Sequence, residues 1–228
     1  MPILALGFDI DGTLYAESKL YRKLFFKAIP RLKLLYAFNS VRHDIRNLLK
    51  SEEYRSKNIK SIDDFHHFQA GLVAKRVGKD QELVHKEIES FFYKAALEPF
   101  SDIPLYKGVK ELLINMKNRG LLLGALSDFP CEEKIKLMGL DGIFDVVMTS
   151  EETGFVKPDP ASFALFAKRM GVDPGKILFV GNSERYDVAG SIGAGMRAAK
   201  ISKKSGPSAA EFVFSDYAEL LRYLEGLL

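Results

Sequence analysis

The sequence has little cysteine, no tryptophan and no long hydrophobic run. The single thiol, Cys131, cannot form an internal disulfide, which excludes a disulfide-stapled scaffold and favours a reducing compartment. The longest apolar runs, such as Ile3–Gly7 and Leu121–Leu126, fall far short of the roughly 20 residues that a membrane-spanning helix needs. The first residues also lack the basic region and the small-residue cleavage site of a signal peptide. We therefore expect a cytoplasmic protein without a membrane partner.

Charge of neither sign predominates, since 33 Lys and Arg balance 30 Asp and Glu to a net charge of +3 among 228 residues. This balance conceals a basic block between Lys19 and Lys60, which holds 12 basic and 3 acidic residues, a net of +9. A basic block in an otherwise acidic chain is typical of proteins that meet nucleic acid, a membrane surface or an anionic substrate. Composition by itself does not distinguish nucleic acid, a membrane surface and an anionic substrate as the partner.

Short apolar segments alternate with amphipathic ones through most of the chain. One helix is indicated by the spacing of Val109, Leu112, Leu113 and Met116, and another begins at the Asp159-Pro160 capping pair. Buried strands are predicted at residues 3–8, 121–126, 144–148, 177–180 and 197–201. Strands that alternate with helices in this way predict βαβ units and a parallel sheet.

Residues 20–97 interrupt this alternation with an almost entirely helical pattern. Pro30 should divide the first helix into two pieces. The apolar face of that helix carries Leu20, Leu24, Ala28, Leu32 and Leu35, and we expect the aromatic residues Tyr21, Phe25, Phe26, Tyr36 and Phe38 to form the core of this segment. We predict an α/β core made of residues 1–16 and 102–228, with a helical insert at residues 17–101. Ligands bind beyond the carboxyl ends of parallel strands, so an insert after the first strand should cover the site as a lid.

Two carboxylates, Asp9 and Asp11, follow the first predicted strand in the motif Asp-Ile-Asp-Gly-Thr. Two acids at this spacing can share one cation such as Mg²⁺. An ionised carboxylate is a competent nucleophile toward a phosphoryl group, and a neighbouring carboxylic acid can protonate a leaving oxygen. The four residues Asp-Ile-Asp-Gly of this motif can also form an ordinary acidic turn.

Three further polar groups lie near the ends of later predicted strands. Ser127, with the backbone N–H groups beside it at Asp128, can donate to phosphoryl oxygens, although a Ser-Asp pair also suits a helix N-cap. Lys157, just before a capped helix, can neutralise developing charge. Asn182 and Asp187 can supply oxygen ligands to a hard cation.

Two other groups of residues are weaker candidates for a metal site or a nucleophile. His66 and His67 are adjacent on a predicted helix and point about 100° apart, so we expect surface residues rather than a metal site. Cys131 has no evident base in the sequence around it, which argues against a thiol nucleophile.

Taken together, the four motifs in this order resemble the haloacid dehalogenase superfamily, most specifically in Phe8-Asp-Ile-Asp-Gly-Thr-Leu14. The resemblance implies a Rossmann-like parallel sheet, and the placement of the insert looks like the helical type-1 cap of that family. It also implies that Asp9 forms an aspartyl-phosphate, that Asp11 is the general acid and base, and that Lys157 steadies Asp9. The implied phosphate-binding residues are Ser127, Asp128 and Lys157, and the implied Mg²⁺ ligands are Asp9, Asp11 through its carbonyl, Asn182 and Asp187.

One position departs from the family pattern, because Asn182 stands where the motif usually has Asp. An amide oxygen carries no charge, so weaker metal binding follows, unless Glu184 compensates. Asp11 in turn favours phosphoester chemistry over carbon–halogen cleavage, since a leaving alkoxide needs a proton donor and a halide does not.

The resemblance therefore implies a Mg²⁺-dependent phosphatase that hydrolyses a small phosphorylated metabolite. Two alternatives stay open: a non-catalytic or regulatory binding protein on the same fold, and a mutase that passes the phosphoryl group to a sugar. An anionic substrate would also account for a basic lid, so no nucleic-acid partner is expected. The sequence leaves the oligomeric state undetermined.

Overall fold

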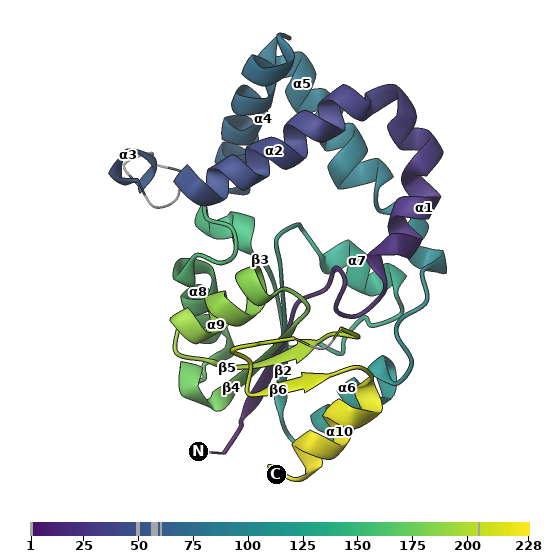
Figure 1. Ribbon diagram of the computed structural model, residues 1–228, viewed down its shortest axis with the longest axis vertical. Coiled ribbons are helices and arrows are strands. Elements are labelled where there is room, and N and C mark those ends of the chain that lie inside the picture. Colours follow the sequence, from purple (N-terminus) through teal and green to yellow (C-terminus); the bar gives the residue numbers. More distant parts are fainter. Residues whose placement is uncertain (1, 49–50, 56–58, 60, 205) are drawn as a thin grey trace.

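The computed structural model describes residues 2–48, 51–55, 59, 61–204 and 206–228, and Figure 1 shows a sheet with helices on both faces and a group of helices over one end. Within those residues six strands form one parallel sheet in the order β3-β2-β1-β4-β5-β6. The strands are β1 (Ala5–Phe8), β2 (Leu122–Ser127), β3 (Val146–Thr149), β4 (Ile177–Gly181), β5 (Arg197–Ile201) and β6 (Phe212–Phe214). The predicted α/β fold with a Rossmann-like parallel sheet is confirmed.

The central strands β1 and β4 are buried along their whole length, which explains their continuous apolar sequence. In the register of the sheet, Phe8 of β1 lies beside Ala125 of β2 and Val180 of β4. The loops that follow these three strands therefore begin at the same edge of the sheet.

Helices cover both faces of the sheet (Figure 1). Leu112 of α6 and Leu220 of α10 belong to the apolar core on one face, and Phe163 and Phe166 of α8 pack with Phe179 of β4 on the other. The core helices are α6 (Val109–Asn118), α7 (Glu132–Leu137), α8 (Pro160–Met170), α9 (Ala189–Gly193) and α10 (Tyr217–Glu225), with the shorter turns η4 (Ser150–Thr153), η5 (Pro174–Lys176) and the π-helical η6 (Glu184–Val188). Asp159 caps α8 as predicted, whereas the sequence analysis did not anticipate α7.

The helical insert lies over the carboxyl ends of the strands (Figure 1). It contains α1 (Glu17–Ala28), η1 (Ile29–Arg31), α2 (Leu32–Leu48), α3 (Glu52–Arg55), α4 (Ile62–Val77), α5 (Gln81–Ile88), the π-helical η2 (Glu89–Ala95) and η3 (Glu98–Asp102). The break expected at Pro30 is confirmed, since the proline lies in the short turn between α1 and α2. Phe38, Phe65 and Val73 belong to a separate apolar core inside the insert.

The expectation that five aromatic residues form the core of the insert is wrong for four of them. Phe38 is fully buried, but Tyr21, Phe25, Phe26 and Tyr36 are 62%, 58%, 80% and 76% exposed. Tyr21 and Phe25 belong to α1, which has no buried residue and whose apolar side lines a cavity, whereas Phe26 of α1 and Tyr36 of α2 do not line that cavity.

The expectation that both histidines lie at the surface is wrong for His66. His67 is exposed, but His66 is buried and forms ion pairs with Glu151 at 3.0 Å and Glu89 at 2.7 Å. Burial opposes the charged imidazolium, but hydrogen bonds and charge from these two carboxylates outweigh it and raise the pKa of His66 to about 9. His66 is therefore a structural cation, which the isolated sequence pattern did not show.

None of the helices in the described residues combines the length and the apolar character that crossing a bilayer requires.

Candidate active site

Four sequence-predicted residues meet at the carboxyl edge of the sheet. Asp9 follows β1, Ser127 ends β2 and Asp187 lies in η6 after β4, while Lys157 comes from the loop before α8. Asp9, Ser127, Lys157 and Asp187 are all buried, at 5%, 0%, 3% and 2% exposed. The strand register brings together residues that are as many as 178 positions apart in the sequence.

Lys157 is the central cation of this group. Its Nζ donates to Asp9 Oδ1 at 2.6 Å and to Asp187 Oδ1 at 2.7 Å. Burial disfavours the ammonium, but the charges of Asp187 and Asp9 outweigh that cost and raise the pKa of Lys157. Lys157 therefore stays charged and holds the two carboxylates side by side.

Asp9 is fixed through both of its oxygens. The second oxygen, Oδ2, accepts a 2.8 Å hydrogen bond from Thr13 Oγ1. Burial raises the pKa of the Asp9 carboxyl to about 7, with Lys157 acting in the opposite direction. Thr13 had not been given a role from the sequence, although the Gly-Thr of the motif placed it four residues after Asp9.

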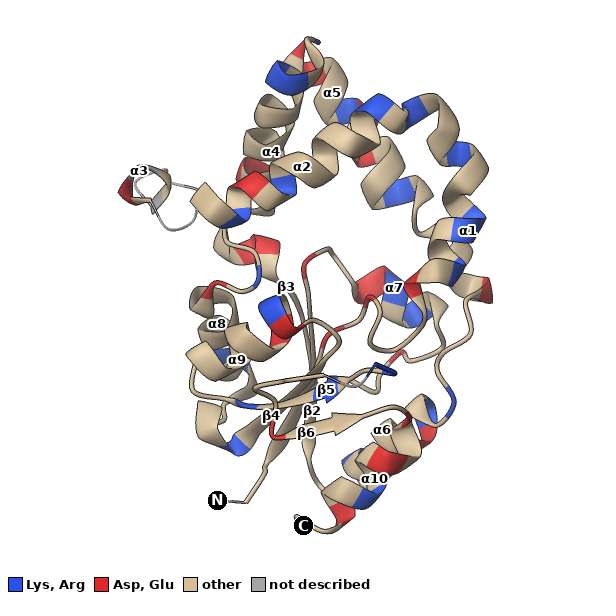
Figure 2. Ribbon diagram, in the orientation of Figure 1, with Lys and Arg blue, Asp and Glu red and all other residues tan. Residues whose placement is uncertain are grey.

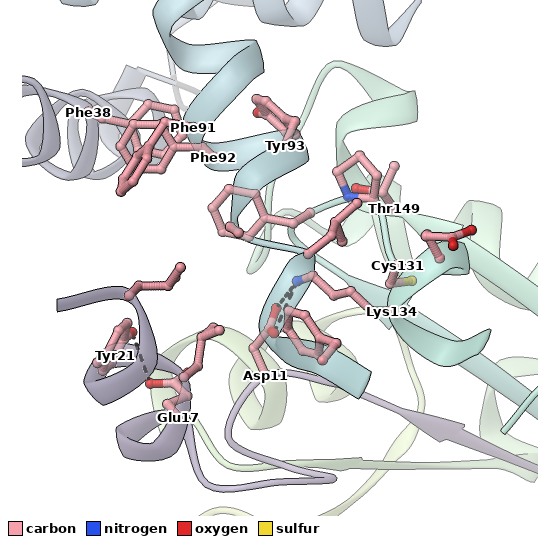
Figure 3. Close-up of a pocket in the computed structure, with 18 of the residues that line it drawn as sticks. Asp11, Glu17, Tyr21, Phe38, Phe91, Phe92, Tyr93, Cys131, Lys134 and Thr149 are labelled. Carbon is pink, nitrogen blue, oxygen red and sulfur yellow. Dashed lines mark hydrogen bonds and ion pairs between the residues drawn. The ribbon is translucent and has the colours of Figure 1, made fainter. Parts of the chain in front are cut away.

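Asp11 has a different set of partners (Figure 3). Lys134 Nζ lies 3.0 and 2.8 Å from its two carboxylate oxygens, and Tyr15 OH donates to Oδ1 at 2.5 Å. Ser127 Oγ donates to Oδ2 at 3.3 Å. Burial favours the neutral acid, but the Lys134 ammonium outweighs it, and the pKa of Asp11 lies below its ordinary value. Lys134 and Tyr15 are partners that the sequence analysis missed.

The carboxylate of Asp128 faces away from this group. It accepts from Arg46 Nη2 and Ser150 Oγ at 2.7 Å each and from the backbone N–H of Lys157 at 2.9 Å. Burial favours the neutral acid, but Lys157 and the arginines outweigh it and lower the pKa of Asp128 to about 2. The phosphate-binding role predicted for Asp128 would therefore fall to its backbone, as the sequence analysis framed it.

Asn182 lies against the Asp-x-Asp motif. Gly12 has a φ of +83°, and a Cβ added there would lie 2.0 Å from Asn182 Nδ2, so only glycine fits beside this amide. The backbone N–H groups of Asn182 and Ser183 donate to Asp187 Oδ2 at 3.2 and 2.9 Å. The amide of Asn182 therefore lies next to the backbone that follows Asp11.

Glu184 is engaged elsewhere. Its carboxylate accepts from Lys200 Nζ at 2.9 Å, from Ser208 Oγ at 2.7 Å and from the backbone N–H of Ala209 at 2.7 Å. With three donors already bound, Glu184 is a poor substitute for the charge that Asn182 lacks.

The donor set suits a hard divalent cation. Among the described residues no three His, Cys, Asp or Glu side chains cluster as a metal group. The predicted site depends instead on two buried carboxylates, Asp9 and Asp187, with the amide of Asn182 and the Asp11 carbonyl. Asp9 and Asp187 share the Lys157 ammonium, which is one positive charge for two carboxylates. Carboxylate, amide and carbonyl oxygens are the ligands that Mg²⁺ prefers, so the residues fit the ion.

A cavity of about 720 Å³ opens beside Asp11, between the helical insert and the core. Asp11, Tyr15, Cys131 and Lys134 line it from the core side, and the apolar side of α1 and the rings of Phe38, Phe91 and Phe92 line it from the insert (Figure 3). Cys131 is buried, which raises the pKa of its thiol to about 12, so it stays protonated as expected of a structural residue.

The described residues of the basic block do not line this cavity. Figure 2 shows Lys and Arg spread along α1 and α2. Lys23 and Lys27 form ion pairs with Asp102 and Glu98 of η3, and no Lys or Arg among the described insert residues lines the cavity. Lys50, Lys57 and Lys60 lie outside the described residues. The partners of Lys23 and Lys27 are thus carboxylates of the protein and not the anionic substrate that was expected to explain the basic lid.

Arg42 and Arg46 of the same block join the insert to the core. Arg42 Nη1 pairs with Glu151 at 2.5 Å, and Arg46 Nη2 pairs with Asp128 at 2.7 Å. Arg46 Nε also donates to the Lys157 carbonyl at 3.1 Å. These contacts tie α2 to the loops that carry Ser127 and Lys157, a role that charge counting along the sequence does not identify.

Comparison with known proteins places the chain in a family. The model of the haloacid dehalogenase-like hydrolases matches residues 3–195. The glyceraldehyde 3-phosphate phosphatase of Methanopyrus kandleri is 30% identical over 209 residues, which cover 87% of this chain and 84% of that protein. A phosphoglycolate phosphatase of Mannheimia succiniciproducens is 29% identical over 157 residues, 65% of this chain and 69% of that protein.

Solved structures support the same fold. The HAD phosphatase from Thermococcus onnurineus superposes with a TM-score of 0.65 at 23% identity, over 98% of this chain and 99% of that one. The L-2-haloacid dehalogenase from Xanthobacter autotrophicus superposes with a TM-score of 0.70 at 19% identity, over 99% and 100%. The predicted superfamily is thereby confirmed by sequence and by fold: the chain belongs to the haloacid dehalogenase-like hydrolases.

Proposed function

We propose that the protein is a Mg²⁺-dependent phosphatase that hydrolyses a phosphomonoester through an aspartyl-phosphate on Asp9. The observation that carries the proposal is that the buried Asp9 carboxylate is held by Lys157 and Thr13. Asp11, two residues after Asp9, lines the cavity. Relatives named as phosphatases of glyceraldehyde 3-phosphate, phosphoglycolate and phosphoserine support a small phosphorylated substrate.

In the first step a carboxylate oxygen of Asp9 attacks the phosphorus atom of the ester. The bond from phosphorus to the alcohol oxygen breaks, and its electron pair stays on that oxygen. Protonated Asp11 gives its proton to the leaving oxygen, so the product departs as a neutral alcohol. Lys157 offsets negative charge as it develops around Asp9, and Ser127 is placed to donate to a phosphoryl oxygen.

In the second step water attacks the phosphorus atom and the bond to Asp9 breaks. Asp11, now a carboxylate, takes the proton of the water, and free phosphate and the Asp9 carboxylate are restored. The first step needs the protonated form of Asp11, which Lys134 disfavours in this structure, so Asp11 must take up a proton before that step. The second step uses the carboxylate that Lys134 stabilises.

Asp9, Asp187, Asn182 and the Asp11 carbonyl would hold the metal ion. When bound, Mg²⁺ would supply charge neutralisation for the phosphoryl oxygens. Within this proposal residues 1–16 and 102–228 form the catalytic core and residues 17–101 the cap, and the cytoplasmic location inferred from the lone cysteine stays a prediction.

The test is hydrolysis of p-nitrophenyl phosphate with Mg²⁺ and with EDTA. Asp9→Asn should lower kcat by at least about 10⁴-fold, because uncatalysed phosphomonoester hydrolysis is among the slowest known reactions. The matched control is Asp141→Asn, an exposed residue in the loop after α7, which should retain full activity. Undiminished turnover by Asp9→Asn would contradict the nucleophile assignment.

A further inference from the structure

The wall that the insert presents to the cavity is apolar. Leu24, Phe25, Ile29 and Leu32 from the first two helical stretches line it, together with the ring of Phe92. Among the described insert residues that line the cavity, Glu17 is the single charged one, and it lies near Asp11 and Tyr21 (Figure 3). The other charged lining residues all come from the core: Asp11, Glu132, Glu133, Lys134, Lys136 and Glu152.

Several side chains of this apolar wall are left uncovered by protein in the described structure. Phe25, Ile29 and Leu32 are 58%, 47% and 60% exposed, although each lies on the cavity. Exposed apolar surface of this extent is characteristic of a binding site, and a volume of about 720 Å³ is within the usual range for cavities that enclose an organic ligand.

The place of Asp11 fixes the direction in which a substrate would extend. Asp11 lines the cavity, whereas Asp9, Lys157 and Asp187 are grouped deeper at the sheet edge. This step depends on the proposed function: the group that protonates the leaving oxygen must lie on the side of the leaving group. The carbon atoms attached to that oxygen would therefore enter the cavity.

We propose that the substrate is a phosphomonoester of an apolar alcohol, with an alkyl or aryl leaving group that occupies the cavity against α1 and η2. A leaving group rich in hydroxyl or carboxylate groups would find few partners on that wall and would lose its hydration. An apolar one would cover the exposed side chains of α1 and remove them from water.

A series of n-alkyl phosphates tests this with the wild-type protein and Mg²⁺. From ethyl through butyl and hexyl to octyl phosphate, kcat/KM should rise about fourfold for each added methylene until the cavity is filled, the factor expected for burying one CH₂ group. Phosphoglycolate and glycerol phosphate should be poorer substrates than hexyl phosphate. A series that is flat or that falls with chain length would overturn the inference.

Two exposed aromatic residues of the insert provide a matched pair of variants. Phe25 lines the cavity, while Tyr36 is 76% exposed and is not part of its lining. Phe25→Asp should lower the ratio of kcat/KM for octyl over ethyl phosphate by at least about 10-fold, since it replaces an apolar contact with a charge. Tyr36→Asp should leave both the ratio and the activity at the wild-type level. Equal ratios in the two variants would contradict the inference.

The two proposals fail in different ways. If wild type hydrolyses none of the phosphates faster than Asp9→Asn does, the phosphatase assignment fails and the substrate class fails with it. If wild type hydrolyses ethyl phosphate and the polar phosphates but gains nothing from longer chains, the phosphatase stands and the apolar leaving group is excluded.

Discussion

Arg42 of α2 and Glu151 of η4 form a 2.5 Å ion pair whose side chains are only 4% and 0% exposed. Arg42 also donates through Nη2 to the Asp128 carbonyl at 2.6 Å, and the second oxygen of Glu151 pairs with His66 at 3.0 Å. One buried network thus links two helices of the insert to the loops that follow β2 and β3.

Breaking this pair from one side should destabilise the protein. Arg42→Met leaves Glu151 buried with less compensating charge, and we expect the free energy of unfolding to fall by about 3–5 kcal/mol. Urea denaturation measures the change. Arg76→Met is the control, because Arg76 pairs with Asp44 at the surface and should contribute less than about 1 kcal/mol. Equal effects of the two substitutions would show that the buried pair is not a structural link.

His66 should make stability depend on pH. Its pKa is raised from 6.5 to about 9, so the protonated form stabilises the fold fully below pH 6.5, and that contribution is lost as pH rises through 9. The loss is on the order of 3 kcal/mol. His66→Gln should flatten the unfolding free energy across this range, and His67→Gln, on the exposed neighbour, should retain the wild-type slope. Parallel curves for wild type and His66→Gln would refute the assignment.

Lys134 should act as a positioning residue for Asp11. Replacing it with Met keeps its approximate volume but removes the ammonium that holds both Asp11 oxygens, and we expect kcat to fall at least about 10-fold, part of the usual contribution of general acid–base catalysis. KM should change little. Lys168→Met, at an exposed position of α8 that does not line the cavity, is the matched control. Wild-type kcat in Lys134→Met would exclude this role.

Asn182→Asp should strengthen Mg²⁺ binding, because it adds a charged oxygen beside Gly12 and the two buried carboxylates. The Mg²⁺ concentration needed for half-maximal activity should fall about 10-fold. Asn118→Asp introduces the same charge at the exposed end of α6 and should leave that concentration unchanged. If Asn182→Asp raises it or leaves it unaltered, Asn182 is not a ligand.

Residues fixed by the ends of strands were predictable from the sequence. Short apolar runs that predict buried strands precede Asp9, Ser127 and Asp187. Parallel strands bring their carboxyl ends to one edge of the sheet, so these side chains were expected to meet there. Lys157 was predictable because the Asp159-Pro160 cap marks the start of the next helix.

Contacts of side chains across the fold were not predictable. Lys134 lies on a six-residue helix without a clear apolar repeat, and its partner Asp11 is 123 positions away. The sequence pattern of an apolar helix face is the same whether that face packs on protein or lines a cavity. The periodicity of α1 therefore could not predict that Phe25 is exposed. His66 was misjudged because its burial depends on Glu151 from a distant loop.

The two ends of the insert lie side by side. Tyr15 forms an antiparallel bridge with Leu105, and the Tyr106 N–H donates to the Leu14 carbonyl at 2.8 Å. The chain therefore leaves and re-enters the core through two adjacent extended segments, as an exchangeable domain would. We expect that exchanging residues 17–101 for the equivalent segment of a relative would transfer the choice of leaving group while Asp9 and Lys157 keep their chemistry, which makes this junction a natural site for recombination in evolution and in engineering.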